Sequence, residues 1–152
     1  MSRDPHRYRF RSTWHIDAEP DRVYAALLDV ESYPTWWPQV RKVRQLDESS
    51  GELTCRSLLP YDLTFVVHRE IEDSAGRILR ATMTGDLAGT SQWTVQPDGT
   101  GTAAIFDEDV FVRRAMIRTA GRVARPALTF NHGLMMRSGE KGLRSHLARV
   151  GA

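Results

Sequence analysis

Three consecutive carboxylates, Asp107, Glu108 and Asp109, are the densest group of chemically active side chains in this sequence. They fall in an alternating segment, residues 102–112, that predicts a β-strand, and successive side chains of a strand point to opposite faces. Asp107 and Asp109 therefore share one face while Glu108 takes the other, which makes the three a weak metal site. We expect the two aspartates to lie at a solvated edge, and no metal is predicted.

The other residue types that often carry chemistry show no catalytic or metal-binding spacing. No two of the five histidines are four residues apart, as a helical zinc site requires. Cys55 is the single cysteine, so it forms neither an internal disulfide nor a cysteine-based zinc site, and we interpret it as a small strand residue. There is no serine elbow and no glycine-rich phosphate loop. The sequence indicates neither a zinc enzyme nor a triad hydrolase, and no cofactor is predicted.

Length and composition are those of one globular domain. The chain has 152 residues, of which 41% are hydrophobic and 26% charged, enough for one core. We expect a single domain over residues 1–152, with residues 1–6 as a flexible tail. No apolar run approaches the ~20 residues of a membrane-spanning helix, and the first residues lack the apolar segment of a signal peptide. A cytoplasmic location is therefore expected.

Alternation of apolar and polar residues predicts a series of strands. The first covers residues 8–16, and a helical pattern follows at residues 19–29. Six further strands are predicted at residues 40–46, 52–59, 62–72, 77–84, 89–96 and 102–112. Short turns rich in glycine, proline, serine and aspartate separate them, which indicates an antiparallel meander.

A long helix is predicted at the end of the chain, over residues 114–147. Pro126 should kink or split it, because proline removes a hydrogen bond and clashes with the preceding turn. Gly133, Gly139 and Gly142 each weaken a helix by up to about 1 kcal/mol relative to alanine. We expect these glycines to be tolerated where the helix packs very closely.

Charge is distributed unevenly along this helix. No acidic residue occurs between residues 110 and 139. Four arginines are spaced to form one helical stripe: Arg114, Arg118, Arg122 and Arg125. One interpretation is transient contact with an anionic membrane surface or an acidic protein, and no specific nucleic acid is predicted as a partner. The other is a solvated face, because 19 of the 21 basic residues are arginine and any local count is inflated.

Several short motifs together resemble one protein family. Two tryptophans stand on a stiff, proline-broken segment, Tyr33-Pro34-Thr35-Trp36-Trp37-Pro38, after a strand and a helix opened by Asp17-Ala18-Glu19-Pro20. The others are Leu59-Pro60-Tyr61, Gly85-Asp86-Leu87-Ala88-Gly89 with Trp93, Asn131-His132, and Gly139-Glu140-Lys141-Gly142-Leu143. This combination resembles the START-like (SRPBCC) superfamily, in particular its bacterial polyketide cyclase/dehydrase and lipid-transport branch. The resemblance covers nearly the whole chain.

The resemblance implies an α+β helix-grip fold. In this fold a curved antiparallel sheet of about seven strands wraps around a long C-terminal helix, and two short helices follow the first strand. An apolar cavity lies between the sheet and the long helix. One of Trp36 and Trp37 should then cap the core while the other is exposed near the cavity mouth.

The same resemblance, with Trp93 facing inward, selects the residues that would line the cavity. The predicted ligand-binding residues are Trp14, Leu63, Phe65, Met83, Trp93, Phe106, Glu108, Asn131 and Met135. Glu108 would be a carboxylate among apolar neighbours, where it must find a partner or stay protonated. Arg69, on a neighbouring inner row, is a candidate partner, and these two are the catalytic candidates. The alternatives are an ion pair at the surface or rim, or a strand register slipped by one residue.

Two functions of different classes follow, with a third behind them. The first is binding or transport of a hydrophobic small molecule, such as a lipid, an isoprenoid or a polyketide-like compound. The second is a polyketide cyclase or aromatase that uses polar groups of the same cavity for enolisation and loss of water. The third is a protein- or membrane-interaction module that uses the arginine stripe.

Overall fold

Seven antiparallel strands form one sheet in the computed structural model, which describes residues 4, 6–56, 62–115 and 121–150. The strand order is β1-β7-β6-β5-β4-β3-β2, so each strand after the first pairs with its neighbour in sequence, and β1 closes on β7. The strands are β1 (Arg7–Ile16), β2 (Val40–Gln45), β3 (Ser50–Cys55), β4 (Leu63–Asp73), β5 (Ile78–Gly85), β6 (Leu87–Asp98) and β7 (Gly101–Val112). The predicted meander is confirmed. Of the predicted strand at residues 52–59, residues 57–59 lie outside the described residues.

Helices follow two of the strands, β1 and β7. α1 (Pro20–Leu28), the 3-10 turn η1 (Val30–Ser32) and α2 (Tyr33–Trp36) join β1 to β2, and η2 (Gly121–Ala124) leads into α4 (Arg125–Val150). The prediction of one continuous helix over residues 114–147 was wrong, because the 3-10 turn η2 precedes α4, and residues 116–120 of the predicted helix lie outside the described residues. Pro126 lies in the first turn of α4, where the missing N–H has no helical partner to lose. A break at this proline was expected, and the chain uses it to begin the helix.

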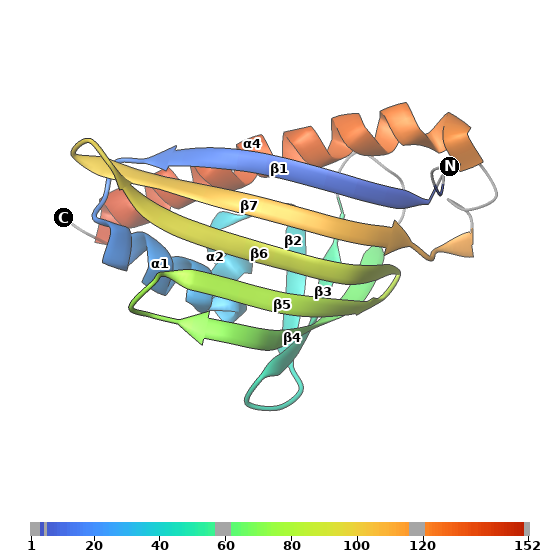
Figure 1. The fold of residues 1–152 in the computed structure, drawn as a ribbon, viewed down its shortest axis with the longest axis horizontal. Coiled ribbons are helices and arrows are strands. Elements are labelled where there is room, and N and C mark those ends of the chain that lie inside the picture. Colours follow the sequence, from blue (N-terminus) through green and yellow to red (C-terminus); the bar gives the residue numbers. More distant parts are fainter. Residues whose placement is uncertain (1–3, 5, 57–61, 116–120, 151–152) are drawn as a thin grey trace.

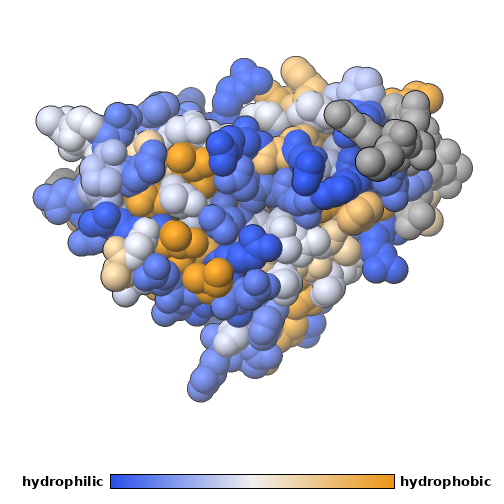
Figure 2. Space-filling view, in the orientation of Figure 1, coloured by the Kyte–Doolittle hydropathy of each residue, from blue (hydrophilic) through white to orange (hydrophobic). Residues whose placement is uncertain are grey.

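The sheet curves around α4. Figure 1 shows β1, β7, β6, β5 and β4 in order across the near side, while β2 and β3 turn behind them and α4 runs along the far side of β1. The short helices α1 and α2 lie at the end where α4 finishes. The near face of the sheet is largely hydrophilic, with hydrophobic residues in small separate patches (Figure 2). The predicted helix-grip architecture is confirmed.

None of the helices in the described part of the chain is both long and apolar enough to cross a membrane.

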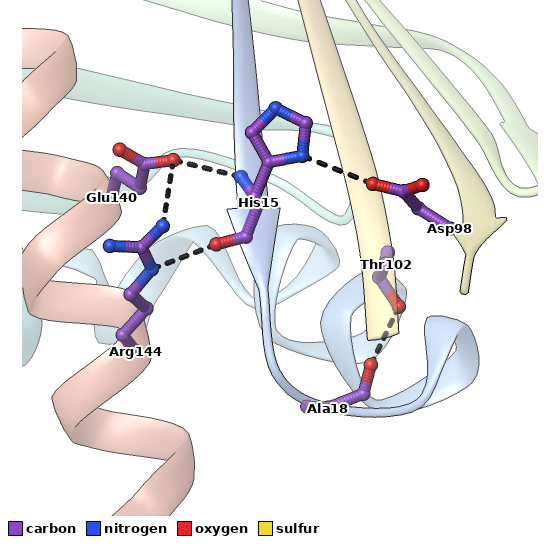
Figure 3. Close-up of polar contacts among 6 residues, drawn as sticks. All are labelled: His15, Ala18, Asp98, Thr102, Glu140 and Arg144. Carbon is purple, nitrogen blue, oxygen red and sulfur yellow. Dashed lines mark hydrogen bonds and ion pairs between the residues drawn. The ribbon is translucent and has the colours of Figure 1, made fainter. Parts of the chain in front are cut away.

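Side chains of α4 bind the free edge of β1 (Figure 3). The backbone N–H of His15 donates to Oε2 of Glu140 at 2.8 Å, and Nε of Arg144 donates to the carbonyl of His15 at 2.8 Å. Close by, Oγ1 of Thr102 donates to the carbonyl of Ala18 at 2.6 Å. An edge strand otherwise exposes such backbone groups. The two hydrogen bonds of His15 fix the helix against the sheet.

All four tryptophans pack together between β1, β6 and α2. The Trp14 ring centroid lies 4.7 Å from that of Trp93, 5.2 Å from that of Trp37 and 6.3 Å from that of Trp36. Such ring pairs contribute about 0.5–1.5 kcal/mol each beyond the burial of their area. The cluster is therefore a rigid, solid end of the core.

Two glycines allow α4 to reach this cluster. A Cβ added to Gly139 would lie 2.6 Å from the Trp37 ring and 2.7 Å from the Trp14 ring. A Cβ added to Gly142 would overlap the carbonyl oxygen of Trp36. Gly133 has no such contact, since the nearest atom to its Cβ position is a guanidinium nitrogen of Arg137 at 3.9 Å. The expected close approach therefore holds at two of the three helical glycines.

Candidate functional site

A cavity of about 440 Å³ lies between the inner face of the sheet, the α1–α2 segment and α4. This volume is within the range of small-molecule sites, roughly 300–1,000 Å³. Eight of the nine predicted ligand-binding residues line it: Leu63, Phe65, Met83, Trp93, Phe106, Glu108, Asn131 and Met135. Alternation along the strands placed the inner face correctly, because Trp93 pairs with Phe106 and Ser91 pairs with Glu108 in the observed register.

Trp14 is the predicted residue that does not line the cavity. Its side chain does face inward, but it is only 2% exposed and packs within the tryptophan cluster. Alternation predicts the face of a strand residue but not the distance to what lies opposite. At this end Gly139 lets α4 come so close that no space remains.

The prediction that one of Trp36 and Trp37 is exposed at the cavity mouth was wrong. Both are buried, at 4% and 6% exposure. Trp37 forms part of the cavity wall, and its Nε1 donates to the carbonyl of Met135 at 2.9 Å. Trp36 lies behind it, with its ring stacked on Trp37 at 5.6 Å between centroids.

Glu108 projects into the cavity, and its partner is His132. Nε2 of His132 lies 3.3 Å from Oε1 of Glu108, and the two side chains are 17% and 9% exposed. The imidazole also stacks on the Phe10 ring, with centroids 3.8 Å apart and planes 10° apart. A carboxylate and an imidazole so placed can together accept, donate or transfer a proton.

Arg69 was the candidate partner of Glu108, but the two residues do not pair in the structure. Arg69 also lines the cavity, but its Nη1 lies 2.8 Å from Oε1 of Glu72. Arg69 is on β4 and Glu108 on β7, with β5 and β6 between them. Two intervening strands put the two residues roughly 14 Å apart at a spacing of about 4.8 Å per strand.

The sequence did contain a signal for His132. The residues of α4 that line the cavity follow helical spacing, and they are Leu128, Asn131, His132, Met135 and Met136. Positions i, i+3, i+4, i+7 and i+8 form one face of a helix. The Asn131-His132 pair therefore had to share the apolar face, where a histidine needs a polar partner.

Asp107 and Asp109 lie on the outer face, as the alternation predicted. Asp109 accepts hydrogen bonds from Nε and Nη2 of Arg7 at 2.9 and 2.7 Å, and Asp107 accepts from Arg11 at 2.7 Å. The Arg7 guanidinium holds the pKa of Asp109 below its usual value. Because Glu108 faces inward in this register, the alternative of a strand slipped by one residue is excluded.

Two further polar side chains of the cavity wall, Cys55 and Tyr33, are poor candidates for catalysis. Burial raises the pKa of the Cys55 thiol to about 12, so it stays protonated at neutral pH and is a poor nucleophile. The hydroxyl of Tyr33 donates to the carbonyl of Leu27 at 2.6 Å, and burial raises its pKa.

In the described ranges no three His, Cys, Asp or Glu side chains come together as a metal site would require.

The arginines of the predicted stripe do not lie on one continuous helix. The predicted members were Arg114, Arg118, Arg122 and Arg125. Arg114 precedes the helices and lies 3.8 Å from Asp86, whereas Arg125 opens α4 and donates to the carbonyl of Arg7 at 2.8 Å. Arg122 falls in the 3-10 turn η2, and Arg118 lies outside the described residues. The 3-10 turn interrupts the regular helix that the stripe required.

The family follows from comparison of the sequence with known families. A family model described as polyketide cyclase / dehydrase and lipid transport matches residues 7–146. The chain belongs to this family. The resemblance to the START-like superfamily is thereby confirmed, with the lipid-transport and cyclase members in one family description. No curated protein sequence matches the chain significantly.

Solved structures share the fold over almost the whole chain. The protein TTHA0849 of Thermus thermophilus has a TM-score of 0.84 at 17% identity and covers 95% of this chain and 100% of its own. The Zhui aromatase/cyclase of Streptomyces has a TM-score of 0.80 at 18% identity, covering 97% of each chain. A START superfamily protein of Mycobacterium smegmatis has a TM-score of 0.73 at 18% identity, covering 93% of this chain and 98% of its own. At these identities the likeness establishes the fold alone.

Proposed function

We propose that this family member binds or transports a hydrophobic small molecule, such as a lipid, an isoprenoid or a polyketide-like compound, in the cavity between the sheet and α4. The observation that carries the proposal is the cavity itself, about 440 Å³ with largely aromatic and aliphatic walls. Protein cores are packed as densely as organic crystals and leave few voids larger than a water molecule. An apolar cavity of this size lowers stability unless a ligand fills it.

The proposal predicts that the purified protein holds or takes up an apolar compound. Denaturation in organic solvent, followed by mass spectrometry of the released small molecules, should show a discrete apolar compound in roughly stoichiometric amount. If the endogenous ligand is lost during purification, the protein should take up an apolar probe such as pyrene on dialysis. A folded protein that releases nothing and takes up no apolar probe would contradict the proposal.

A second candidate function is that of a polyketide cyclase or aromatase. The specific observation that favours it is the Glu108–His132 pair inside the cavity, because enolisation and loss of water both need a positioned proton donor and acceptor. The structural relative from Streptomyces is an aromatase/cyclase by its description. The apolar walls would fold the chain of the substrate, and the pair would take a proton from a carbon next to a carbonyl and give one to the hydroxyl group that leaves as water.

Glu108→Gln separates the two functions. If the protein turns over a poly-β-ketone substrate, this change should lower kcat by about 100-fold, because general acid–base catalysis typically contributes that much or more. Affinity should change far less, since the amide keeps the size of the carboxylate. Steady-state kinetics and equilibrium binding on the same variant measure the two effects. A variant with unchanged kcat would remove Glu108 from the catalytic candidates.

A further inference from the structure

The cavity stops abruptly on each of the elements that meet the tryptophan cluster. Its last lining residues in this direction are Trp93 on β6, Phe106 on β7 and Met136 on α4, and Trp93 stands opposite Phe106 in the strand register. The buried residues that follow on the inner side do not line the cavity, and they are Val95, Ala104, Gly139 and Leu143. The space therefore ends at a wall, and solid core lies behind it.

Two tryptophans, Trp37 and Trp93, form this end wall. The Trp93 ring packs against two others, with its centroid 4.7 Å from that of Trp14 and 4.6 Å from that of Phe106. Trp37 is tied to α4, since its Nε1 donates to the carbonyl of Met135 at 2.9 Å. Side chains packed as densely as in a crystal cannot move back without losing contacts. The end wall should therefore hold its place when a ligand presses on it.

The space in front of the end wall is small for a lipid site. Along β6 its lining runs from Leu87 to Trp93, which is roughly 20 Å at about 3.3 Å per residue. The volume of about 440 Å³ equals that of roughly fifteen water molecules at about 30 Å³ each. A methylene group is close to water in size, so the cavity holds an alkyl chain of roughly fifteen carbons. A phospholipid with two acyl chains is far larger.

The cavity opens to solvent between η1 and the connection from β2 to β3. Glu31 in η1 lines it, as do Asp47 and Glu48 in the connection, and all three residues are exposed. A ligand that is too large for the space must leave its excess in water at this opening, because the end wall does not give way. Only the part that enters the cavity gains free energy from burial.

We infer that Trp93 limits the size of the ligand, so that the ligand is a single-chain or compact apolar molecule and not a phospholipid with two acyl chains. This inference rests on the proposed function, whose cavity it uses. Each methylene group that enters the cavity raises the affinity about fourfold. Once the chain has filled the space up to the end wall, further methylene groups stay in water and add nothing.

Straight-chain alcohols of increasing length, from octanol to octadecanol, measure where the space ends. Each alcohol displaces pyrene from the protein, and the change in pyrene fluorescence gives its dissociation constant. We expect the constant to fall about fourfold per added methylene group up to roughly fifteen carbons and then to level off. After incubation with phosphatidylcholine vesicles, the re-isolated protein should carry no phospholipid by mass spectrometry.

Trp93→Ala should move this plateau to chains at least about two carbons longer, because the space of the indole is only partly refilled by its neighbours. Val95→Ala is the matched control. It also removes buried side-chain atoms from the inner face of β6, but behind the end wall, so the plateau should stay where the parent has it. If Trp93→Ala does not fold by circular dichroism, Trp93→Leu should move the plateau in the same direction by at least about one carbon.

The outcomes separate this inference from the function beneath it. An affinity that rises without a plateau, retention of the two-chain phospholipid, a plateau unchanged in the folded Trp93 variant, or an equal shift in Val95→Ala would each overturn the inference. All of these would leave a cavity that binds apolar molecules. If the folded parent binds neither pyrene nor any of the alcohols, the proposed function fails and the inference fails with it.

Discussion

Gly142→Ala is expected to destabilise the protein by about 2–4 kcal/mol, although alanine is the better helix former. The new methyl group would overlap the carbonyl oxygen of Trp36, which is backbone and cannot rotate away. To relieve the overlap, α4 must move off α2, and that movement opens the packing of Trp36 and Trp37. Urea unfolding followed by circular dichroism gives the free energy of unfolding for the variant and the parent.

Gly133→Ala is the matched control on the same helix. Its methyl group meets only open space and the far end of Arg137, so helix propensity alone should act. We expect a gain of up to about 1 kcal/mol. If Gly142→Ala were as stable as Gly133→Ala, α4 would not lie on α2 as the structure has it. The close approach of α4 would then no longer explain why the cavity is closed at the tryptophan cluster.

The sheet was predicted well from the sequence because side chains alternate with a period of two, so each residue of a strand can face only one of two sides. Once Trp93 faces inward, the parity of every neighbouring strand follows, and Phe65, Met83 and Phe106 all line the cavity as expected. The alternation also predicted correctly that Asp107 and Asp109 lie on the outer face and Glu108 on the inner face. These are local properties of a strand, and tertiary packing did not override them.

Contacts that depend on how the helix is placed against the sheet were harder to predict. Glu108 and His132 meet only because α4 turns one particular face toward β7, and a sequence does not fix that rotation relative to the sheet. Trp14 was assigned to the cavity for a related reason: alternation gives its direction, but the close approach of α4 at Gly139 leaves no space there. Volume is a property of the packed molecule.

The second large effect is expected on ligand binding. Ala81 faces the cavity from β5 and stands opposite Ser91, so Ala81→Trp would place an indole in the space that the ligand requires. We expect the affinity for pyrene to fall by at least about 100-fold, equal to about 2.8 kcal/mol. The fold should survive, because the new ring enters a cavity rather than a packed core.

Thr84→Trp is the control for this substitution. It adds the same side chain to the same strand, but Thr84 is exposed on the opposite face of the sheet. Affinity for pyrene should therefore remain within about twofold of the parent, since no wall of the cavity has changed. A similar loss in both variants would indicate a general effect on stability rather than occupation of the cavity.

Equilibrium dialysis of pyrene against the parent protein, Ala81→Trp and Thr84→Trp tests the central claim most directly. If the cavity between the sheet and α4 holds an apolar ligand, the parent and Thr84→Trp should retain pyrene at about one molecule per chain, and Ala81→Trp should retain almost none. Equal retention by all three folded proteins would show that the ligand binds elsewhere on the molecule and would contradict the account.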